Sequence, residues 1–398
     1  MKNAFLYFLF CPFLGFINAI KYYRSTWAKP TLIAFVAFFG MSMVNNEAVD
    51  GSEYVERLIV MHANSVDFDT FKASFFNETE GLPDLYVGIV TYFFSLFTDN
   101  GQLLFFFYGF VFGYFYINNI WLVLNETRGE LSWLPILLLL TFSFVLGFWT
   151  VTGVRMNTAS HIFFYGAFLY LYHNQKKGIF IVLSSVLFHF SFILPIGIFL
   201  IYTLVRLNYR FIYLFYLASF FVAELNVEFI RTFLELNLPD FLQPKVKSYL
   251  NDEYVETFYD GIGSRNWYVN YYQKLLSYFT FVFMLFILFK VDLTKSVQKL
   301  LGFSLLLLAV ANITSLLPSG GRFLDVAFLF SIATCFIAIT HLKFHLVTKS
   351  ATILSPLLLL FCIISIRMSF DFFNITTFTN PLVVLFTDIN IPLIDLIK

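Results

Sequence analysis

Charged side chains are scarce in this sequence. Of its 398 residues, 13% are Asp, Glu, Lys or Arg and 59% are hydrophobic, and the mean hydropathy is +0.78. Soluble domains carry about 25% charged residues, so a water-soluble fold is excluded. The 25 basic and 25 acidic residues cancel, so there is no excess of positive charge to attract nucleic acid.

Motifs for nucleotide binding, zinc binding or a serine hydrolase are also missing. The chain has no Walker loop, no HExxH helix, no CxxC pair and no GxSxG elbow. The three cysteines, Cys11, Cys335 and Cys362, lie in apolar stretches, where a thiol is usually a small packing residue. ATP-driven transport, zinc chemistry and serine hydrolysis are not expected, and any catalysis would use Arg, His and carboxylates without a metal or another cofactor.

Long hydrophobic runs fill most of the chain. A window of about 19 residues predicts membrane spans at 4–20, 31–45, 102–124, 131–149, 158–172, 211–223, 268–289, 300–316, 323–340 and 351–366. Region 85–98 is short for a span of about 20 residues, and region 178–205 is long and contains Pro195, which breaks a helix. We therefore predict an all-α, polytopic membrane protein, a single domain over 1–398 with about 11–14 transmembrane or re-entrant helices.

Basic residues in short connections set the orientation, because cytoplasmic loops are rich in Lys and Arg. Those assigned to the cytoplasm are Lys21, Arg24, Lys29, Arg128, Lys176, Lys177, Arg206, Arg210, Lys290, Lys295, Lys299, Lys343 and Lys349. This assignment predicts that 85–98 is re-entrant or interfacial. It also predicts a broken helical hairpin at 178–205 with His189 and Ser191 near its outer tip, although one long tilted helix is the alternative.

The same assignment places two long loops on the outer face, 46–84 and 225–267. The turn at 318–322 and the tail from Arg367 lie there too, together with nearly all the Asp and Glu residues. Loops on a rigid scaffold commonly carry function, so a site is expected on this face.

Three ionisable residues next to the outer ends of spans are candidates for function, because such groups are costly at membrane depth. Arg155 follows Gly153 and opens a helix, where its guanidinium and free backbone N–H groups suit phosphate oxygens. His189 lies in an apolar run, and Arg322 follows two glycines that let a backbone approach a ligand. The alternatives are an arginine snorkelling at the interface, a structural histidine and a simple turn.

The two outer loops hold further polar candidates. Asp50, Glu53 and Tyr54 would fall on one side of a helix, since residues three and four apart are neighbours. A solvated amphipathic loop is the more common explanation of such a run. The second loop mixes tyrosines with both charges, including Arg265, which suits either sugar stacking or a segment at the membrane surface.

Several of these residues, in this order, resemble the EpsG-like and Wzy-type family of bacterial polysaccharide polymerases. The resemblance is carried by Asp50-Gly-Ser-Glu-Tyr54, Gly-Val-Arg155 with Ala159, Lys176-Lys177, Phe-His189-Phe-Ser191 and Gly-Arg322. It covers most of the chain, but the motifs are short, and little around Arg322 aligns with the family.

The resemblance implies a GT-C-like glycosyltransferase of the bacterial inner membrane with its active site and both long loops in the periplasm. It would polymerise oligosaccharide repeat units carried on undecaprenyl diphosphate, without a metal. Arg155 and Arg322 would hold the leaving diphosphate, His189 or Asp50 would be the general base, and Glu53, Tyr54 and Arg265 would contribute to substrate binding. The implied partners are the lipid-linked donor and acceptor, membrane lipids and a chain-length regulator, with no nucleic acid.

Three other functions fit a chain of this kind. A lipid-linked oligosaccharide flippase usually shows two related halves and polar residues along a central passage, whereas this chain shows one-sided polarity and no repeat. A membrane O-acetyltransferase would need an early catalytic histidine and arginine. A non-enzymatic partner in a polysaccharide export complex would use the long loops as docking surface.

Overall fold

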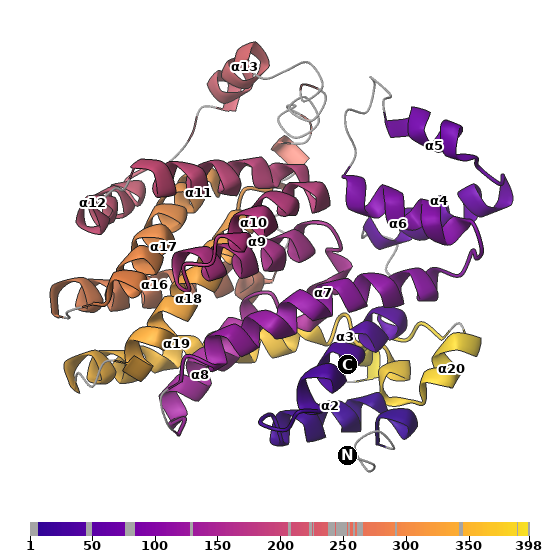
Figure 1. The fold of residues 1–398 in the computed structure, drawn as a ribbon, viewed down its shortest axis with the longest axis horizontal. Coiled ribbons are helices and arrows are strands. Elements are labelled where there is room, and N and C mark those ends of the chain that lie inside the picture. The colour runs from indigo at the N-terminus through magenta and orange to yellow at the C-terminus, as the bar shows by residue number, and fades with distance from the viewer. Residues whose placement is uncertain are drawn as a thin grey trace.

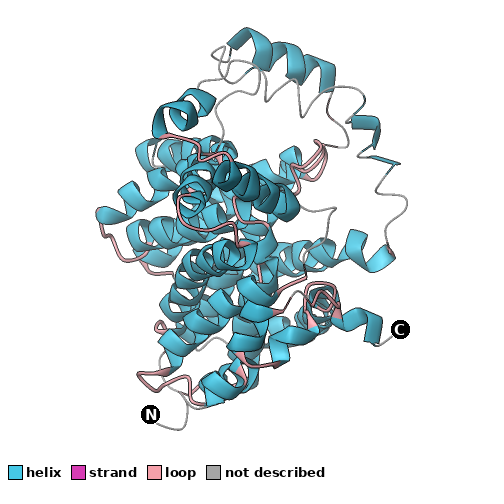
Figure 2. Ribbon diagram, turned by 90° about the vertical axis from the view of Figure 1, so that its right-hand side faces the viewer, coloured by secondary structure: helices cyan, strands magenta, loops and turns pink. Residues whose placement is uncertain are grey.

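The computed structural model describes residues 7–44, 50–75, 84–127, 130–205, 208–222, 225, 227–237, 243, 253, 255–257, 259–260, 266–290, 293–341, 345–387 and 389–396. Within these ranges every regular element is a helix, and β pairing is limited to one isolated bridge between Asn374 and Pro392 (Figures 1 and 2). The predicted all-helical fold class is confirmed.

The first half of the chain contains α2 to α11 with two short 3₁₀ helices. Their bounds are α2 Pro12–Lys21, α3 Ala28–Ser42, α4 Asp50–Ala63, α5 Phe68–Phe75, α6 Leu85–Ser95, α7 Gly101–Leu124, α8 Trp133–Val145, η1 Phe148–Thr152, α9 Met156–Leu171, α10 Lys177–Phe188, η2 Phe190–Phe192 and α11 Ile193–Val205. The outer loop predicted at 46–84 thus holds two helices, α4 and α5.

The second half adds four long helices and several short elements. Their bounds are α12 Tyr209–Ser219, α13 Val227–Asn237, α16 Trp267–Lys290, α17 Lys295–Thr314, α18 Arg322–His341, α19 His345–Ser369, η4 Ile375–Phe378, α20 Pro381–Phe386 and η5 Leu393–Leu396. Most of the large loop predicted at 225–267 lies outside the described residues.

Five segments are long and apolar enough to cross a membrane. They are Gly101–Leu124, Trp133–Thr152, Lys295–Thr314, Arg322–His341 and Thr348–Ser369. Large apolar side chains also face outward from the helices, with exposed fractions of 71–88% at Phe10, Phe180, Leu204, Phe211, Phe221, Leu236 and Phe386. Such surfaces are unfavourable in water and normal against lipid, so the chain is a helical, membrane-embedded protein.

One predicted span is interrupted, and the two regions that the sequence set apart from the spans, 85–98 and 178–205, contain a short helix and a broken one. The span predicted at 4–20 is interrupted at Cys11, and α2 begins at Pro12 and has only 10 residues. Helix α6 has 11 residues, about 16 Å of helix, which is too short for a hydrocarbon core of about 30 Å. Region 178–205 is not one continuous helix, because α10 ends at Phe188 and α11 begins at Ile193.

Two hydrophobic cores hold the bundle together. The larger one joins α8–α12 to α16–α19, where the Phe330 ring lies 5.0 Å from Phe303 and 5.9 Å from Phe163. The smaller one joins α2, α3, α4 and α7 to η1 and the C-terminal segment, where the Phe39 ring lies 5.0 Å from that of Phe373. The N-terminal and C-terminal segments therefore share a core.

Helices α3 and α7 cross at close range in the smaller core. A Cβ at Gly40 would lie 2.5 Å from the Phe105 carbonyl oxygen, and a Cβ at Gly109 would lie 2.8 Å from that of Val36. Small residues at a crossing allow the two backbones to approach. This contact fixes the N-terminal half of α7, on which α4 and α6 pack.

The two ends of the helical bundle can be told apart by the contacts between the helices that end there. At one end Glu126 accepts a hydrogen bond from the Tyr172 hydroxyl at 2.9 Å, and the Lys299 ammonium donates to Asn174 at 2.8 Å. This end carries the lysines of α10 and α17 that the sequence assigns to the cytoplasm. At the other end, α4 and α6 lie beside the start of α7 (Figure 1).

Single cysteines should separate these two ends in intact cells. In a cysteine-free background, Asn64→Cys after α4 should react with an impermeant maleimide once the outer membrane is permeabilised. Gln175→Cys, equally exposed before α10, should react only after the inner membrane is lysed. The opposite pattern would invert the predicted orientation.

Candidate functional site

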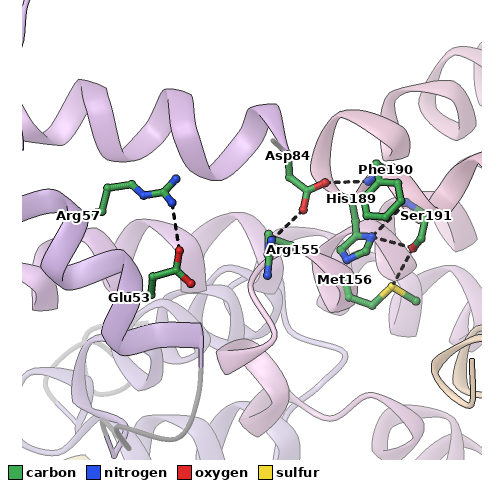
Figure 3. A network of polar contacts seen from close by, with 8 residues as sticks. All are labelled: Glu53, Arg57, Asp84, Arg155, Met156, His189, Phe190 and Ser191. Carbon is green, nitrogen blue, oxygen red and sulfur yellow. Dashed lines mark hydrogen bonds and ion pairs between the residues drawn. The ribbon is translucent and has the colours of Figure 1, made fainter. Parts of the chain in front are cut away.

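A buried aspartate and a half-buried arginine form an ion pair at the end of the bundle that carries α4 and α6 (Figure 3). The Arg155 guanidinium lies 3.2 Å from Asp84 Oδ2, and the two side chains are 28% and 3% exposed. Asp84 is thus shielded from water on nearly all sides, whereas part of the guanidinium stays accessible. A partly accessible cation can bind an incoming anion, while the carboxylate fixes its position.

The backbone before Arg155 is built to hold that side chain in place. After α8 the chain forms η1 and turns at Gly153, and Arg155 is then the N-cap residue of α9. The Asn157 amide donates to the Thr150 carbonyl at 2.8 Å, and a Cβ at Gly153 would collide with that amide. A side chain at position 153 would therefore displace the Asn157 amide from its hydrogen bond within the turn that presents Arg155.

Asp84 joins two segments that are distant in sequence. It is the N-cap residue of α6, and its Oδ1 accepts a hydrogen bond from the Phe190 backbone N–H at 2.8 Å. Phe190 begins η2, directly before α11. The starts of α6, α9 and η2 thus meet at one carboxylate, and helix starts carry partial positive charge that favours anions.

His189 lies next to this junction and is 5% exposed. Its Nδ1 accepts a hydrogen bond from the Ser191 backbone N–H at 3.2 Å, and Ser191 Oγ lies 2.7 Å from the same nitrogen. Because an amide N–H only donates, Nδ1 carries the lone pair, and in the neutral ring Nε2 carries the proton. Ser191 Oγ also contacts Met156 Sδ at 3.8 Å, which ties His189 to the residue after Arg155.

Aromatic rings line the side of the site formed by α4 and α6. The Arg155 guanidinium lies 5.7 Å from the centre of the Tyr54 ring, within the range of a cation–π contact. Tyr86, two residues after Asp84, packs its ring 4.4 Å from Phe188. We use the name Arg155 site for Tyr54, Asp84, Tyr86, Arg155 and His189.

Two buried hydroxyls close to the ion pair in sequence have no hydrogen-bond partner among the described residues. They are Tyr86 Oη on α6 and Thr158 Oγ1 on α9. Buried polar atoms are nearly always hydrogen-bonded, so an unpaired one requires an explanation.

Of the residues on α4 that the sequence singled out, Tyr54 lies at the Arg155 site and Glu53 does not. Tyr54 faces inward and is 3% exposed, as is required for its contact with Arg155. Glu53 instead points outward, with a 62% exposed side chain, and pairs with Arg57 at 3.0 Å. The expectation that Glu53 and Tyr54 share one side of the helix is wrong, because adjacent residues are about 100° apart on a helix. Asp50 begins α4, one turn before Tyr54.

Of the other two predicted residues the structure describes only Arg322, and no hydrogen bond or ion pair among the described residues joins it to a residue of the Arg155 site. Arg322 is exposed at the start of α18, and among the described residues its guanidinium forms no ion pair. Gly320 before it packs directly against the Thr314 carbonyl oxygen, so this glycine serves a tight turn. Arg265 lies outside the described residues.

Asp84 is the functional candidate that sequence reasoning missed, since it was treated only as the last residue of the loop predicted at 46–84. The signal was present, because an aspartate immediately before an apolar run is a common helix N-cap. Its partner Arg155 is 71 positions away, and nothing local in the sequence reveals that pairing.

Within the described residues, no group of three or more His, Cys, Asp and Glu side chains could hold a metal ion. Comparisons of the chain with protein-family models, curated proteins and solved structures found no match. What the chain does is therefore inferred from the chemistry of the Arg155 site and from the sequence motifs that meet there.

Proposed function

We propose that this protein is a membrane-embedded, GT-C-like glycosyltransferase that polymerises oligosaccharide units carried on undecaprenyl diphosphate, at the periplasmic face of the bacterial inner membrane. The observation that carries this proposal is the ion pair between Asp84 and Arg155 at the meeting point of three helix starts. Such a junction suits the diphosphate of a lipid-linked sugar, which is the leaving group of the reaction.

In this reaction an acceptor sugar hydroxyl attacks the anomeric carbon of the donor. The bond between that carbon and the diphosphate oxygen breaks, and its electron pair leaves with undecaprenyl diphosphate. The hydroxyl proton passes to a base. Negative charge grows on the diphosphate, so fixed cations and N–H donors aimed at it lower the barrier.

Arg155 is proposed to bind the leaving diphosphate. Its guanidinium is 28% exposed and is braced by the Asp84 carboxylate on one side and the Tyr54 ring on another. A braced guanidinium loses little conformational freedom on binding, and its planar fork matches two phosphate oxygens.

His189 is proposed to act as a hydrogen-bond donor instead of the general base suggested by the resemblance. Since Nδ1 accepts from the Ser191 amide, the neutral ring presents Nε2–H. Both Asp84 oxygens are occupied, by Arg155 and by the Phe190 N–H, which makes Asp84 a poor base. Asp50, the other base that the resemblance implies, remains the proposed base, although its side chain is not among those that the structure describes.

The surroundings of the site favour a substrate with a lipid anchor. Helix α6 begins at the site and exposes Leu85, Ile89 and Phe93, with Phe93 58% exposed. These positions are four residues apart and form one apolar stripe along the helix. An undecaprenyl chain could lie along this stripe while its diphosphate reaches Arg155.

Deleting the protein tests the proposed activity. Cells that make the polymer should then accumulate lipid-linked single repeat units and lose the ladder of longer chains, since export of the unit continues while joining stops. The measurement is a gel of lipid-linked glycans, with the gene supplied on a plasmid as the control. Loss of single units at the periplasmic face would point to a flippase, and an unchanged ladder without O-acetyl groups would point to an acetyltransferase.

A further inference from the structure

The end of α7 opposite the Arg155 site borders a cavity. The cavity has a volume of about 730 Å³ and lies between α2, α3, α7 and α8. Its walls are mainly apolar and include Leu32, Ile120, Trp121 and Phe144. The volume falls within the range of about 300–1,000 Å³ typical of small-molecule sites.

The cavity is separate from the Arg155 site. Its lining on α7 runs from Tyr116 to Leu124, whereas Tyr108, which hydrogen-bonds to Thr91 on α6, marks the level of the Arg155 site. At 1.5 Å per residue along the helix axis, Tyr108 lies about 12 Å from Tyr116 and about 24 Å from Leu124. No residue of the Arg155 site lines the cavity.

Two positively charged side chains lie at the rim of the cavity. Lys21 and Arg24 both line it from the turn between α2 and α3, and both are exposed. Each lies over a neighbouring tyrosine ring, Lys21 at 5.4 Å from Tyr22 and Arg24 at 5.5 Å from Tyr23. In the described part of the chain neither forms an ion pair, and Glu130 is the one acidic residue that lines the cavity.

The cavity is also open toward the surroundings of the bundle. Among its lining residues, Ile20, Ile136 and Leu140 are 51%, 44% and 45% exposed. In a membrane-embedded protein, apolar side chains exposed on α2 and α8 face lipid. A lipid could therefore enter the cavity laterally from the bilayer, with its hydrocarbon chain first.

We propose that this cavity binds one anionic phospholipid, with an acyl chain between α2, α7 and α8 and its phosphate held by Lys21 and Arg24. A neutral apolar ligand would leave the two cations unused, and a free inorganic phosphate would leave the apolar cavity unfilled. Basic residues at a membrane surface attract anionic lipids. An apolar cavity with an unpaired cationic rim thus selects an anionic amphiphile.

Native mass spectrometry of the purified full-length protein tests this assignment. Phosphatidylglycerol and phosphatidylcholine with identical acyl chains are titrated in mild detergent. We expect one saturable phosphatidylglycerol site with at least about tenfold preference over phosphatidylcholine, given two cations at the headgroup. Inorganic phosphate at equal concentration should not displace it, because phosphate has no chain to fill the cavity.

Three variants assign the site to the cavity. Lys21→Ala with Arg24→Ala should abolish the preference, whereas Lys176→Ala with Lys177→Ala, which removes two exposed lysines elsewhere, should keep it. Ser143→Leu narrows the cavity without changing charge and should weaken phosphatidylglycerol binding, at a wild-type melting temperature. Equal binding of the two lipids, displacement by phosphate alone, or full binding by the Lys21/Arg24 variant would overturn the proposal.

Discussion

Replacing Arg155 by alanine should lower the polymerisation rate by on the order of a hundredfold, about 3 kcal/mol, because one lost donor to a developing oxyanion commonly costs that much. Arg155→Lys should cost nearly as much. Lysine keeps the charge but loses the planar fork that binds two phosphate oxygens, and it cannot keep both the Asp84 and the Tyr54 contacts in their present geometry. The measurement is polymer length and initial rate with lipid-linked units in liposomes, at matched protein abundance.

The chain offers a closely matched control in Arg367. Its guanidinium lies 3.2 Å from Asp371, the same distance as in the Arg155 pair, and 5.9 Å from the centre of the Tyr268 ring. This pair is exposed, however, with side chains 37% and 51% accessible, and joins adjacent turns at the end of α19. Arg367→Ala and Arg367→Lys should change the rate less than about twofold, since exposed pairs contribute little.

The lysine variant decides between two roles for Arg155. An arginine that only anchors the protein at the membrane interface is well replaced by lysine, which snorkels in the same way. Full-length polymer from Arg155→Lys would therefore reduce Arg155 to an anchor or a simple point charge. Normal polymer from Arg155→Ala would remove it from the site altogether.

The long helices of the fold could be predicted from hydropathy, whereas the break in the first predicted span could not. The spans predicted at 102–124 and 323–340 agree with Gly101–Leu124 and Arg322–His341 to within one residue at each end. An uninterrupted apolar run leaves the backbone no alternative to helix in lipid. The window averages over a break such as the one at Cys11, however, and so merges segments that Pro12 separates.

Long-range contacts were the part of the fold that the sequence did not reveal. The segment after α19 returns to the end of α3, where the Val44 N–H donates to the Phe372 carbonyl and the Ser42 and Thr377 hydroxyls lie 3.1 Å apart. Hydropathy predicted only a tail from Arg367. Pairing between segments more than 300 positions apart depends on tertiary packing, which local patterns do not record.

For the Arg155 site, too, the local motifs could be predicted from the sequence, whereas the contacts between distant residues could not. The motifs around Tyr54, Arg155 and His189 were recognisable one by one. In the structure Arg155 contacts both Tyr54 and Asp84, and the residue after His189 donates to Asp84. The partner that joins them was missed because its role lies in contacts to Arg155 and Phe190, at separations of 71 and 106 positions. Arg322 was singled out by its glycines, which the structure explains by a turn.

Asp84→Asn should lower the polymerisation rate roughly tenfold to a hundredfold, because a guanidinium released from its carboxylate no longer holds the diphosphate at the reacting distance. Asparagine is similar in size, and its carbonyl oxygen can still accept from the Phe190 N–H, so the change isolates the lost ion pair. Asp84→Ala removes that hydrogen bond as well, which should lower the free energy of unfolding by about 1–3 kcal/mol. Asp371→Asn in the exposed pair is the control and should leave both quantities near wild type.

A double-mutant cycle separates a positioning role for Asp84 from a direct one. If Asp84 acts through Arg155, then Asp84→Asn should cost little in a background that already carries Arg155→Lys, because the geometry it maintains is gone. If Asp84 itself takes the acceptor proton, the two losses of rate should multiply. The pH profile of the Asp84→Asn variant should then no longer show the titration of a catalytic base. We expect strong non-additivity with an unchanged pH profile, since both carboxylate oxygens are already engaged by Arg155 and the Phe190 N–H. Multiplying losses would make Asp84 the base and would leave Asp50 without its proposed role.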